Sequence, residues 1–428
     1  MTVRHSAEGV DMPTKSAIQC GQLIDATANE PMSHVSVLVE SGMIVAVQDQ
    51  GESIPADYDV IDLGNATLMP GLIDVHAHLT SPHSLPEGGA SYDVHRAAYI
   101  GAHNARQALL GGVTTVRDVG SPAGVAAALT HAVERRWILG ARIVSCGQII
   151  CATGGHAFTA ISAADSGIGV EADGADAMRR EVRRQIKAGA DAIKIAVTHH
   201  APVCEFTREE LDAVVDEAAR HFKPVACHAA NEPGIATAIA AGVTSIEHGY
   251  FADPASVDRL VEAGIYLVPT ISIACGMLDG DMSEEAIEIH QRQHVERRGW
   301  TKDRRDAALA YTLEKASNCE RTVRHAVAAG AKIAVGTDAP LGWAKLPLDA
   351  ARNEVMHLVR LGMSALSAIE AGTRVSSEVA GFDKIVGTVE PGKLADLIAV
   401  DGDPIDDIRV LDRVFFVMKE GEIVRSSL

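Results

Sequence analysis

Residues 69–79 read Met69-Pro-Gly-Leu-Ile-Asp-Val-His-Ala-His-Leu79. The apolar residues before the histidines are typical of a strand that is buried on both faces, as in a parallel sheet. Side chains two positions apart in a strand lie on the same face, so His76 and His78 project together from one strand end. This arrangement suits a metal site, although two histidines alone are equally compatible with a structural role.

The length and charge of the chain limit its fold and its partners. It has 428 residues, 47% of them hydrophobic, and a formal net charge of -19. Its length predicts one large domain and a smaller one. Nucleic acids and anionic membranes bind basic surfaces, so the acidic charge argues against both, and we expect a small-molecule substrate.

The cysteines and the hydropathy pattern predict a cytoplasmic protein. The seven cysteines are dispersed along the chain without paired spacing, which is typical of reduced thiols. The polar start of the chain lacks the apolar core of a signal peptide. No apolar run approaches the ~18 residues that a membrane span requires.

Both ends of the chain predict a small β-domain. Short strand-like runs separated by Gly, Ser and Asp occur at 35–39, 43–47, 60–63, 397–400, 410–418 and 421–424, and we expect them to form antiparallel sheet. Neither end has enough strands to be stable alone, so we predict that the two ends together form one β-sandwich domain. The expected segments are a polar N-terminal segment over 1–16, β-domain parts over 17–67 and 385–428, and a central domain over 68–384.

The central domain alternates strand-like runs with amphipathic helical patterns, which is the signature of βα units. After the first strand these runs are 113–116, 142–145, 192–195, 224–227, 243–246, 265–268 and 332–335. Eight strands in about three hundred residues predict an α/β fold of the TIM (β/α)8 barrel type. An insertion over 276–324 is either a lid over the site or a peripheral addition.

Polar residues stand at the predicted strand ends, where barrels gather their catalytic groups. His228 follows the fifth strand, His248 the sixth and Asp338 the eighth. Taken singly, each histidine could be a hydrogen-bonded core residue, and Asp338 could cap a helix. Together with His76 and His78 they predict a metal centre, because so many buried polar groups need partners.

Lys194 in the fourth strand adds a distinctive group to this set. A lysine amine that has reacted with carbon dioxide becomes an anionic carbamate, whose two oxygens can bridge two cations. The alternative is an unmodified lysine that forms a salt bridge with Asp338 or Asp118.

These motifs resemble those of the amidohydrolase superfamily over nearly the whole chain. The matching segments, in family order, are Pro70–His78, Ile193–Lys194, Cys227–Ala229, Glu247–Gly249 and Gly336–Asp338, followed by Gly387–Val400. The last segment resembles the family's return into its small β-domain.

The resemblance implies a role for each residue. His76, His78 and Asp338 would hold one divalent metal, His228 and His248 the second, and Lys194 would bridge them as N6-carboxylysine. A hydroxide shared by the metals would attack the amide, and Asp338 would pass its proton to the leaving amine. Zinc suits these ligands, with manganese, cobalt or iron as alternatives.

Two further segments resemble the metal-dependent dipeptidase or prolidase-like branch, which includes enzymes that act on aryl amides of amino acids. They are Thr114–Gly120 and Thr153–Ala157. His156 is the residue expected to touch substrate, either by polarising the scissile carbonyl or by binding a carboxylate; the alternative is a loop histidine that faces solvent.

Other predicted substrate contacts are His199, His200 and Tyr250. The first two depart from the small, glycine-rich residues expected there, and they either recognise a carboxylate or narrow the site. The first hypothesis is a binuclear hydrolase of amide bonds in dipeptides, N-acyl amino acids or aryl amides of amino acids. The second is a mononuclear hydrolase or deaminase of a cyclic or carbamate-type small molecule, and the third is a structural protein that has lost the chemistry. The family also implies a homo-oligomer.

Overall fold

The computed structural model describes residues 15–28, 30–81, 94–159, 167–199, 203–275, 302–340 and 349–427. The chain divides into two compact units. The first consists of residues 1–71 and 382–428, and the second of residues 72–381. Within the described ranges, no helix has both the length and the apolar character needed to cross a membrane.

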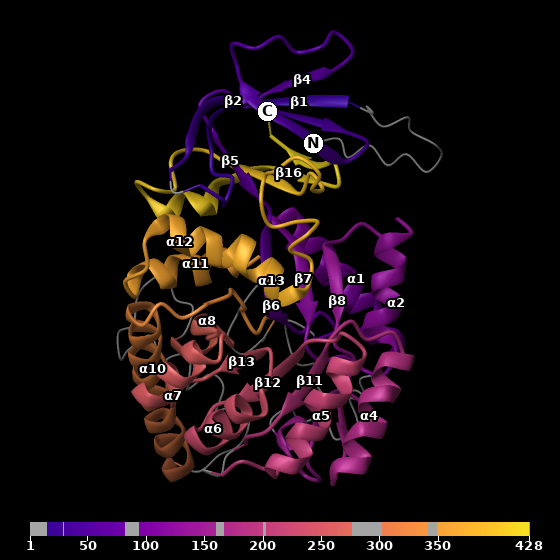
Figure 1. The fold of residues 1–428 in the computed structure, drawn as a ribbon, viewed down its shortest axis with the longest axis vertical. Helices are drawn as coiled ribbons and strands as arrows, with labels where there is room; N and C mark the ends of the chain where they lie inside the picture. The colour runs from indigo at the N-terminus through magenta and orange to yellow at the C-terminus, as the bar shows by residue number, and fades with distance from the viewer. Residues whose placement is uncertain are drawn as a thin grey trace. The chain divides into compact units, whose positions relative to one another are not determined.

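The first unit is built on one eight-stranded sheet (Figure 1). Its strands are β1 (Lys15–Leu23), β2 (Met32–Glu40), β3 (Met43–Asp49), β4 (Asp59–Asp62), β5 (Thr67–Pro70), β15 (Leu397–Val400), β16 (Val414–Lys419) and β17 (Glu422–Ser426). The order is β17-β16-β15-β5-β1-β2-β3, and β4 also pairs with β1. The apolar face of this sheet, including Ile18, Leu68 and Phe416, is fully buried.

The pairing of β1 corrects the sequence prediction for this unit. Residues 16–19 of β1 pair in parallel with β4, and residues 22–23 pair in parallel with β5. Both short strands therefore lie end to end along β1, and the sheet is mixed rather than antiparallel. One continuous sheet replaces the two-sheet sandwich that we expected.

Two local features of the first unit follow from its sequence. Ser41 and Gly42 join β2 to β3, and both have positive φ angles, 49° and 82°, as a two-residue type I′ turn requires. A Cβ atom on Gly42 would lie 2.6 Å from the carbonyl oxygen of Glu420, so only glycine fits there.

The predicted strand over 410–418 is instead a 3-10 helix, η2 (Ile408–Arg413), followed by β16. Asp407 begins this helix by accepting a hydrogen bond from the backbone N–H of Arg409.

The second unit contains parallel strands. They are β6 (Leu72–Ala77), β7 (Val113–Asp118), β8 (Arg142–Ser145), β9 (Ile149–Cys151), β10 (Gly169–Glu171), β11 (Ile193–Ala196), β12 (Val225–Ala229), β13 (Ser245–His248) and β14 (Tyr266–Val268). One sheet has the order β6-β7-β8, and the other has the order β10-β9-β11-β12-β13-β14. The described part of the second unit is thus α/β with parallel sheets, as the alternating pattern predicted.

The expected eighth strand, 332–335, is not assigned as a strand. Ile333 forms an isolated parallel bridge with Leu267 of β14. The carbonyl oxygen of Val335 accepts a hydrogen bond of 2.9 Å from the backbone N–H of Val75 in β6. This short segment therefore links the two parallel sheets, although its pairing is too brief to count as a ladder.

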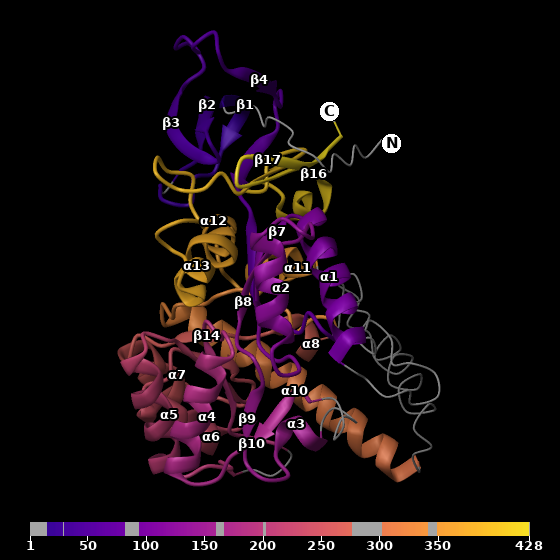
Figure 2. The ribbon, with the colours of Figure 1, turned by 90° about the vertical axis from the view of Figure 1, so that its right-hand side faces the viewer.

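Helices follow the strands of the second unit (Figures 1 and 2). They are α1 (Val94–Leu110), α2 (Val125–Glu134), α3 (His156–Thr159), α4 (Ala175–Lys187), α5 (Arg208–Arg220), α6 (Glu232–Ala241), α7 (Pro254–Glu262), α8 (Ile271–Cys275), α10 (Lys302–Ala328), α11 (Ala351–Arg360), α12 (Ala365–Glu370), the π-helix η1 (Ala371–Val375) and α13 (Ser376–Ala380). Helices α4, α5, α6 and α7 pack in sequence order, each against the next. The capping box of Thr207 and Glu210 at the start of α5 has formed. Of the predicted insertion over 276–324, residues 276–301 lie outside the described residues, and the rest belongs to α10.

A buried carboxyl group fixes the start of α8. Glu354 of α11 accepts hydrogen bonds from the backbone N–H groups of Ile271, at 2.8 Å, and Ser272, at 2.6 Å. Glu354 is only 1% exposed, and burial raises its pKa from 4.5 to about 7. The folded protein therefore retains a proton there at pH values where the unfolded chain has released it.

Glu354→Gln is expected to flatten the pH dependence of stability. Because the folded state binds more protons between pH 4.5 and 7, the free energy of unfolding falls as pH rises through that range, by about 3 kcal/mol for this group. Glutamine does not titrate, so the variant loses this contribution. Urea unfolding of both proteins from pH 4.5 to 8 measures the difference, with the more exposed Glu320→Gln as control. Parallel profiles for wild type and Glu354→Gln would contradict the assignment.

Candidate metal centre

The end of β6 brings three of the predicted ligands together. Backbone hydrogen bonds join this strand end to the segment that carries Asp338: Asp338 N–H donates to the carbonyl of His76 at 2.6 Å, and His78 N–H donates to that of Ala339 at 2.7 Å. Asp338 Oδ1 then lies 3.6 Å from His76 Nε2 and 3.1 Å from His78 Nε2. One ligand atom from each of these residues lies within 4.8 Å of the others, which is a spacing that a single metal ion can occupy.

Asp74 explains how the Asp338 segment is held. This carboxyl group is fully buried and accepts hydrogen bonds from the Thr337 hydroxyl at 2.6 Å and from the Thr337 N–H at 3.1 Å. It also accepts the backbone N–H of His76 at 3.0 Å. Asp338 itself has a φ of 62°, a left-handed conformation that costs about 1–3 kcal/mol in a non-glycine residue. The sequence alone assigned no role to Asp74, because the segment it contacts is about 260 residues away along the chain.

His228 and His248 come from the neighbouring parallel strands β12 and β13. In the register of these strands, His228 pairs with Glu247, and Ala229 pairs with His248. The two imidazole rings are 4.5 Å apart between centroids, and the His248 ring is 4.9 Å from that of His76. The four histidines therefore form one continuous cluster with Asp338.

Lys194 lies in β11, the strand next to β12, and is 2% exposed. Its Nζ has no hydrogen-bond partner among the described residues, so the alternative, a salt bridge to Asp338 or Asp118, is not observed. Burial lowers the pKa of Lys194, while the carboxylates of Glu247 and Asp338 act in the opposite direction. Asp118 bonds instead to the hydroxyl of Ser121. Burying an amine without a hydrogen-bond partner costs free energy unless another group at the site interacts with it.

At His78 the hydrogen bond with Asp338 outweighs the effect of burial and raises the pKa. Burial keeps the other three histidines in the form that binds metal. It lowers the pKa of His248 to about 3 and holds the pKa values of His76 and His228 well below the ordinary value of 6.5. A neutral imidazole has a free lone pair for a metal ion. The pKa of Asp338 is well below its usual value, because the hydrogen bond with His78 and the nearby imidazoles outweigh the effect of burial.

A buried ion pair orients His76. Glu247 Oε2 lies 2.6 Å from His76 Nδ1, and Glu247 Oε1 accepts a hydrogen bond of 2.8 Å from Arg117. Both side chains of the ion pair are 0% exposed. If Nδ1 carries the proton, as the carboxylate favours, Nε2 presents its lone pair toward Asp338. Glu247 and Arg117 lie within the motifs Glu247–Gly249 and Thr114–Gly120, but the sequence alone predicted no role for either side chain.

The predicted substrate contacts are only partly described. His156 begins α3, and its ring is 3.9 Å from that of His228 and 5.7 Å from that of His199. The Tyr250 hydroxyl lies 3.2 Å from His248 Nδ1 and 2.7 Å from the hydroxyl of Thr270. These residues therefore border the cluster, whereas His200 lies outside the described residues.

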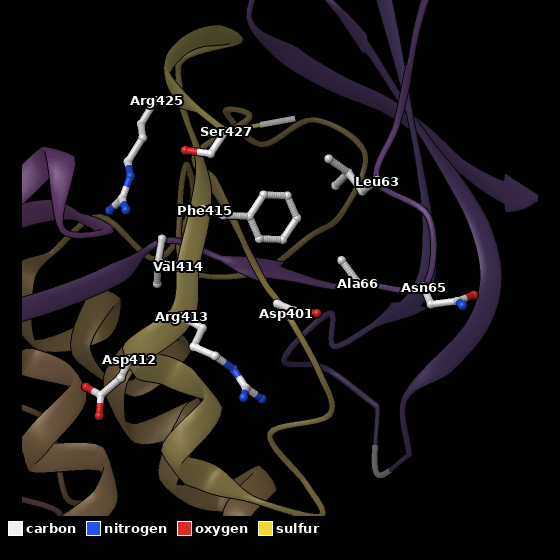
Figure 3. Close-up of a pocket in the computed structure, with 10 residues that line it drawn as sticks. All are labelled: Leu63, Asn65, Ala66, Asp401, Asp412, Arg413, Val414, Phe415, Arg425 and Ser427. Atoms are coloured by element: carbon white, nitrogen blue, oxygen red, sulfur yellow. The ribbon is translucent and has the colours of Figure 1, made fainter. Parts of the chain in front are cut away.

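A cavity of about 510 Å³ lies in the first unit (Figure 3). Its lining residues are Leu63, Asn65, Ala66, Asp401, Asp412, Arg413, Val414, Phe415, Arg425 and Ser427. It contains none of the predicted site residues and no histidine or cysteine. The predicted metal ligands therefore belong to the histidine cluster and not to this cavity.

The donor set of the cluster fits a metal centre. Imidazole nitrogens and a carboxylate are the ligands that zinc and other first-row divalent ions favour in proteins. The amine of Lys194 has no hydrogen-bond partner among the described residues, and His76, His78 and Asp338 each place one ligand atom within reach of a single ion. The residues present therefore suit divalent metal binding.

Comparison with known proteins identifies the family. The model of the Amidohydrolase family matches residues 67–424. Ochratoxinase from Aspergillus niger is 30% identical over 448 aligned positions, which cover 95% of this chain and 86% of that protein. The structure of a Xaa-Pro dipeptidase with methionine bound in its active site is 32% identical with a TM-score of 0.82, covering 96% of this chain and 100% of the other. A prolidase complexed with N-methylphosphonate-L-proline is 27% identical with a TM-score of 0.80, covering 97% and 100%. The chain therefore belongs to the amidohydrolase family and is a hydrolase that acts on amide C–N bonds.

Proposed function

We propose that this protein is a binuclear metal-dependent hydrolase that cleaves the amide bond of dipeptides, N-acyl amino acids or aryl amides of amino acids. The similar dipeptidase, prolidase and ochratoxinase support an amide of an amino acid as the substrate. The buried, unpartnered amine of Lys194 is the observation that carries the binuclear part of the proposal. A carbamate at this position would supply a shared ligand between the two groups of metal-binding residues.

The proposal includes a closed (β/α)8 barrel in the second unit. Support comes from the links of 332–339 to β14 on one side and to β6 on the other. On the opposite side, the carbonyl oxygen of Ser145 in β8 accepts hydrogen bonds from the backbone N–H groups of Asp191, at 2.7 Å, and Ala192, at 3.2 Å, just before β11. With these links the strands β6, β7, β8, β11, β12, β13 and β14 and the 332–335 segment form a ring.

The metal ligands fall into two groups. His76, His78 and Asp338 are close enough to hold one ion, and we assign the second ion to His228 and His248. Carboxylated Lys194 would be a ligand of both. Zinc fits the nitrogen and oxygen donors of both groups. Two divalent ions bound there would lower the pKa of water and polarise the substrate carbonyl.

Asp338 and the bordering residues would serve the reaction around those ions. Asp338 contacts both histidines through Oδ1, and at 15% exposure it is the most accessible member of its group, so it is placed to accept a proton and pass it to the leaving amine. His156 and Tyr250 would orient the substrate carbonyl or its carboxylate. The bond that breaks is the amide C–N bond, and the products are a carboxylic acid and an amine.

Metal analysis and a substrate panel test the proposal. We expect two divalent ions per chain in active protein, loss of activity on treatment with a chelator, and its recovery with zinc, manganese, cobalt or iron. The panel contains dipeptides, N-acyl amino acids, aryl amides and lactones. One ion per chain together with deamination of a ring compound would favour the mononuclear alternative. A fully metallated protein that cleaves none of the amides would contradict the proposed function.

A further inference from the structure

Lys315 of α10 extends toward the edge of the metal centre. Its ammonium lies over the ring of Tyr250, 5.4 Å from the centroid. Helix α10 packs against α8 (Figure 2). Lys315 Nζ lies 3.5 Å from the carbonyl oxygen of Ile273 in α8. That distance is well beyond the usual 2.9–3.0 Å, so the contact is weak.

The charge of Lys315 is poorly balanced. Over the part of the chain that the structure describes, no carboxylate lies within ion-pair distance of its ammonium, and the side chain is partly buried. Burial lowers its pKa, while the negative charge of Asp338 is near enough to oppose that shift. Arg360, by contrast, lies 2.7 Å from Glu320. A cation with spare donors beside a reaction centre is suited to bind an anion.

Tyr250 places this ammonium close to the predicted metal ligands. The Tyr250 ring is 5.2 Å from the ring of His248, and its hydroxyl is hydrogen-bonded to Thr270. One aromatic ring thus separates Lys315 from the cluster. Lys315 lies within α10 and follows no strand end, so the sequence pattern did not single it out.

We propose that Lys315 is a specificity-determining residue that binds the free carboxylate of the amino-acid part of the substrate. This inference rests on the proposed function. In an N-acyl amino acid, three bonds separate the carboxylate carbon from the scissile carbonyl carbon, so the two lie within about 4 Å of each other. An ammonium that pairs with the carboxylate at about 2.8 Å must therefore be near the reaction centre, as Lys315 is. Neutral amides without this carboxylate are poor substrates.

The test compares one substrate in two forms. The first form is the dipeptide or N-acyl amino acid of the panel that is cleaved fastest, and the second has its carboxylate converted to a carboxamide. Wild type is expected to prefer the carboxylate about 10- to 100-fold in kcat/KM, the range for a hydrogen bond to a charged group. Lys315→Met removes the charge at similar volume and should lose this preference through a higher KM for the carboxylate form. Lys315→Arg should retain most of the preference.

A matched control separates binding from packing. Lys332 also lies over a tyrosine ring, 5.0 Å from the centroid of Tyr266, but outside the cluster, so Lys332→Met should preserve the preference. Competitive inhibition by the free amino-acid product gives a second readout, and Lys315→Met should weaken it about 10-fold or more.

Equal rates of wild type on both forms, or an unchanged preference in Lys315→Met, would overturn the inference while leaving the proposed amide hydrolase activity intact. If Lys315→Met does not fold, Lys315→Gln and the wild-type comparison decide the question. Absence of cleavage of any amide would instead reject the proposed function.

Discussion

Lys194→Met is expected to lower kcat about 10³-fold or more while leaving the metal-free protein as stable as wild type. The amine is buried without a hydrogen-bond partner among the described residues, so its removal breaks no ion pair. Burying an unpaired ammonium is unfavourable, and methionine of similar length avoids that cost. Activity depends on the carbamate that would join the two ions, and a contribution of several kcal/mol to the transition state corresponds to at least three orders of magnitude. Metal content should fall from two ions per chain toward one.

The control for this prediction is Lys194→Arg, which retains a positive charge but cannot form the carbamate. If activity depends on the carbamate, the Lys194→Arg variant should be inactive and should not bind the second ion. Reloading metal-free wild type in buffer freed of carbon dioxide should give slow recovery, and added bicarbonate should accelerate it. An active Lys194→Arg variant, or a metal-free Lys194→Met protein that melts well below wild type, would show that this lysine has a structural role instead.

Much of the site could be predicted because parallel strands place their ends together. Once His76, His228 and His248 were assigned to the ends of different strands in one parallel sheet, their proximity followed from topology. The structure does bring these rings within 4.9 Å of their neighbours. Groups that depend on tertiary contacts were not predictable in the same way. Asp74 and Lys315 become informative only when the segments they contact are known, because neither follows a strand end.

The elements that depend on local sequence pattern were predicted well. The pairing between distant strands was predicted less well. The strand β8 lies where the sequence placed it, because a run of apolar residues is a local signal. The parallel pairing of β1 with β4 and β5 joins segments about forty residues apart, and no local signal distinguishes it from antiparallel pairing. Val410 and Leu411 are buried although they lie in a 3-10 helix. Apolar residues in the segment 410–413 were therefore not sufficient to identify a strand.

Glu247→Gln is expected to weaken metal binding about 10- to 100-fold and to destabilise the fold by about 3–5 kcal/mol. The first effect arises because the carboxylate beside His76 Nδ1 fixes the ring and its tautomer, and partners of metal ligands typically contribute this much to affinity. The second arises because glutamine leaves Arg117 buried at 0% exposure without a counter-charge. Competition with a chromophoric chelator measures the affinity, and urea unfolding of the metal-free protein measures the stability.

Two further variants separate these effects from a general loss of charge. Asp216→Asn disrupts an ion pair with Arg179 that is partly exposed to solvent, so it should change stability only slightly and leave metal affinity unaltered. Combining Arg117→Met with Glu247→Gln removes both buried charges, and the double variant should therefore be more stable than the sum of the single changes predicts. Metal affinity should remain low in that double variant, since His76 still lacks its carboxylate. Additive losses of stability, or full metal affinity in Glu247→Gln, would mean that Glu247 neither balances Arg117 nor orients His76.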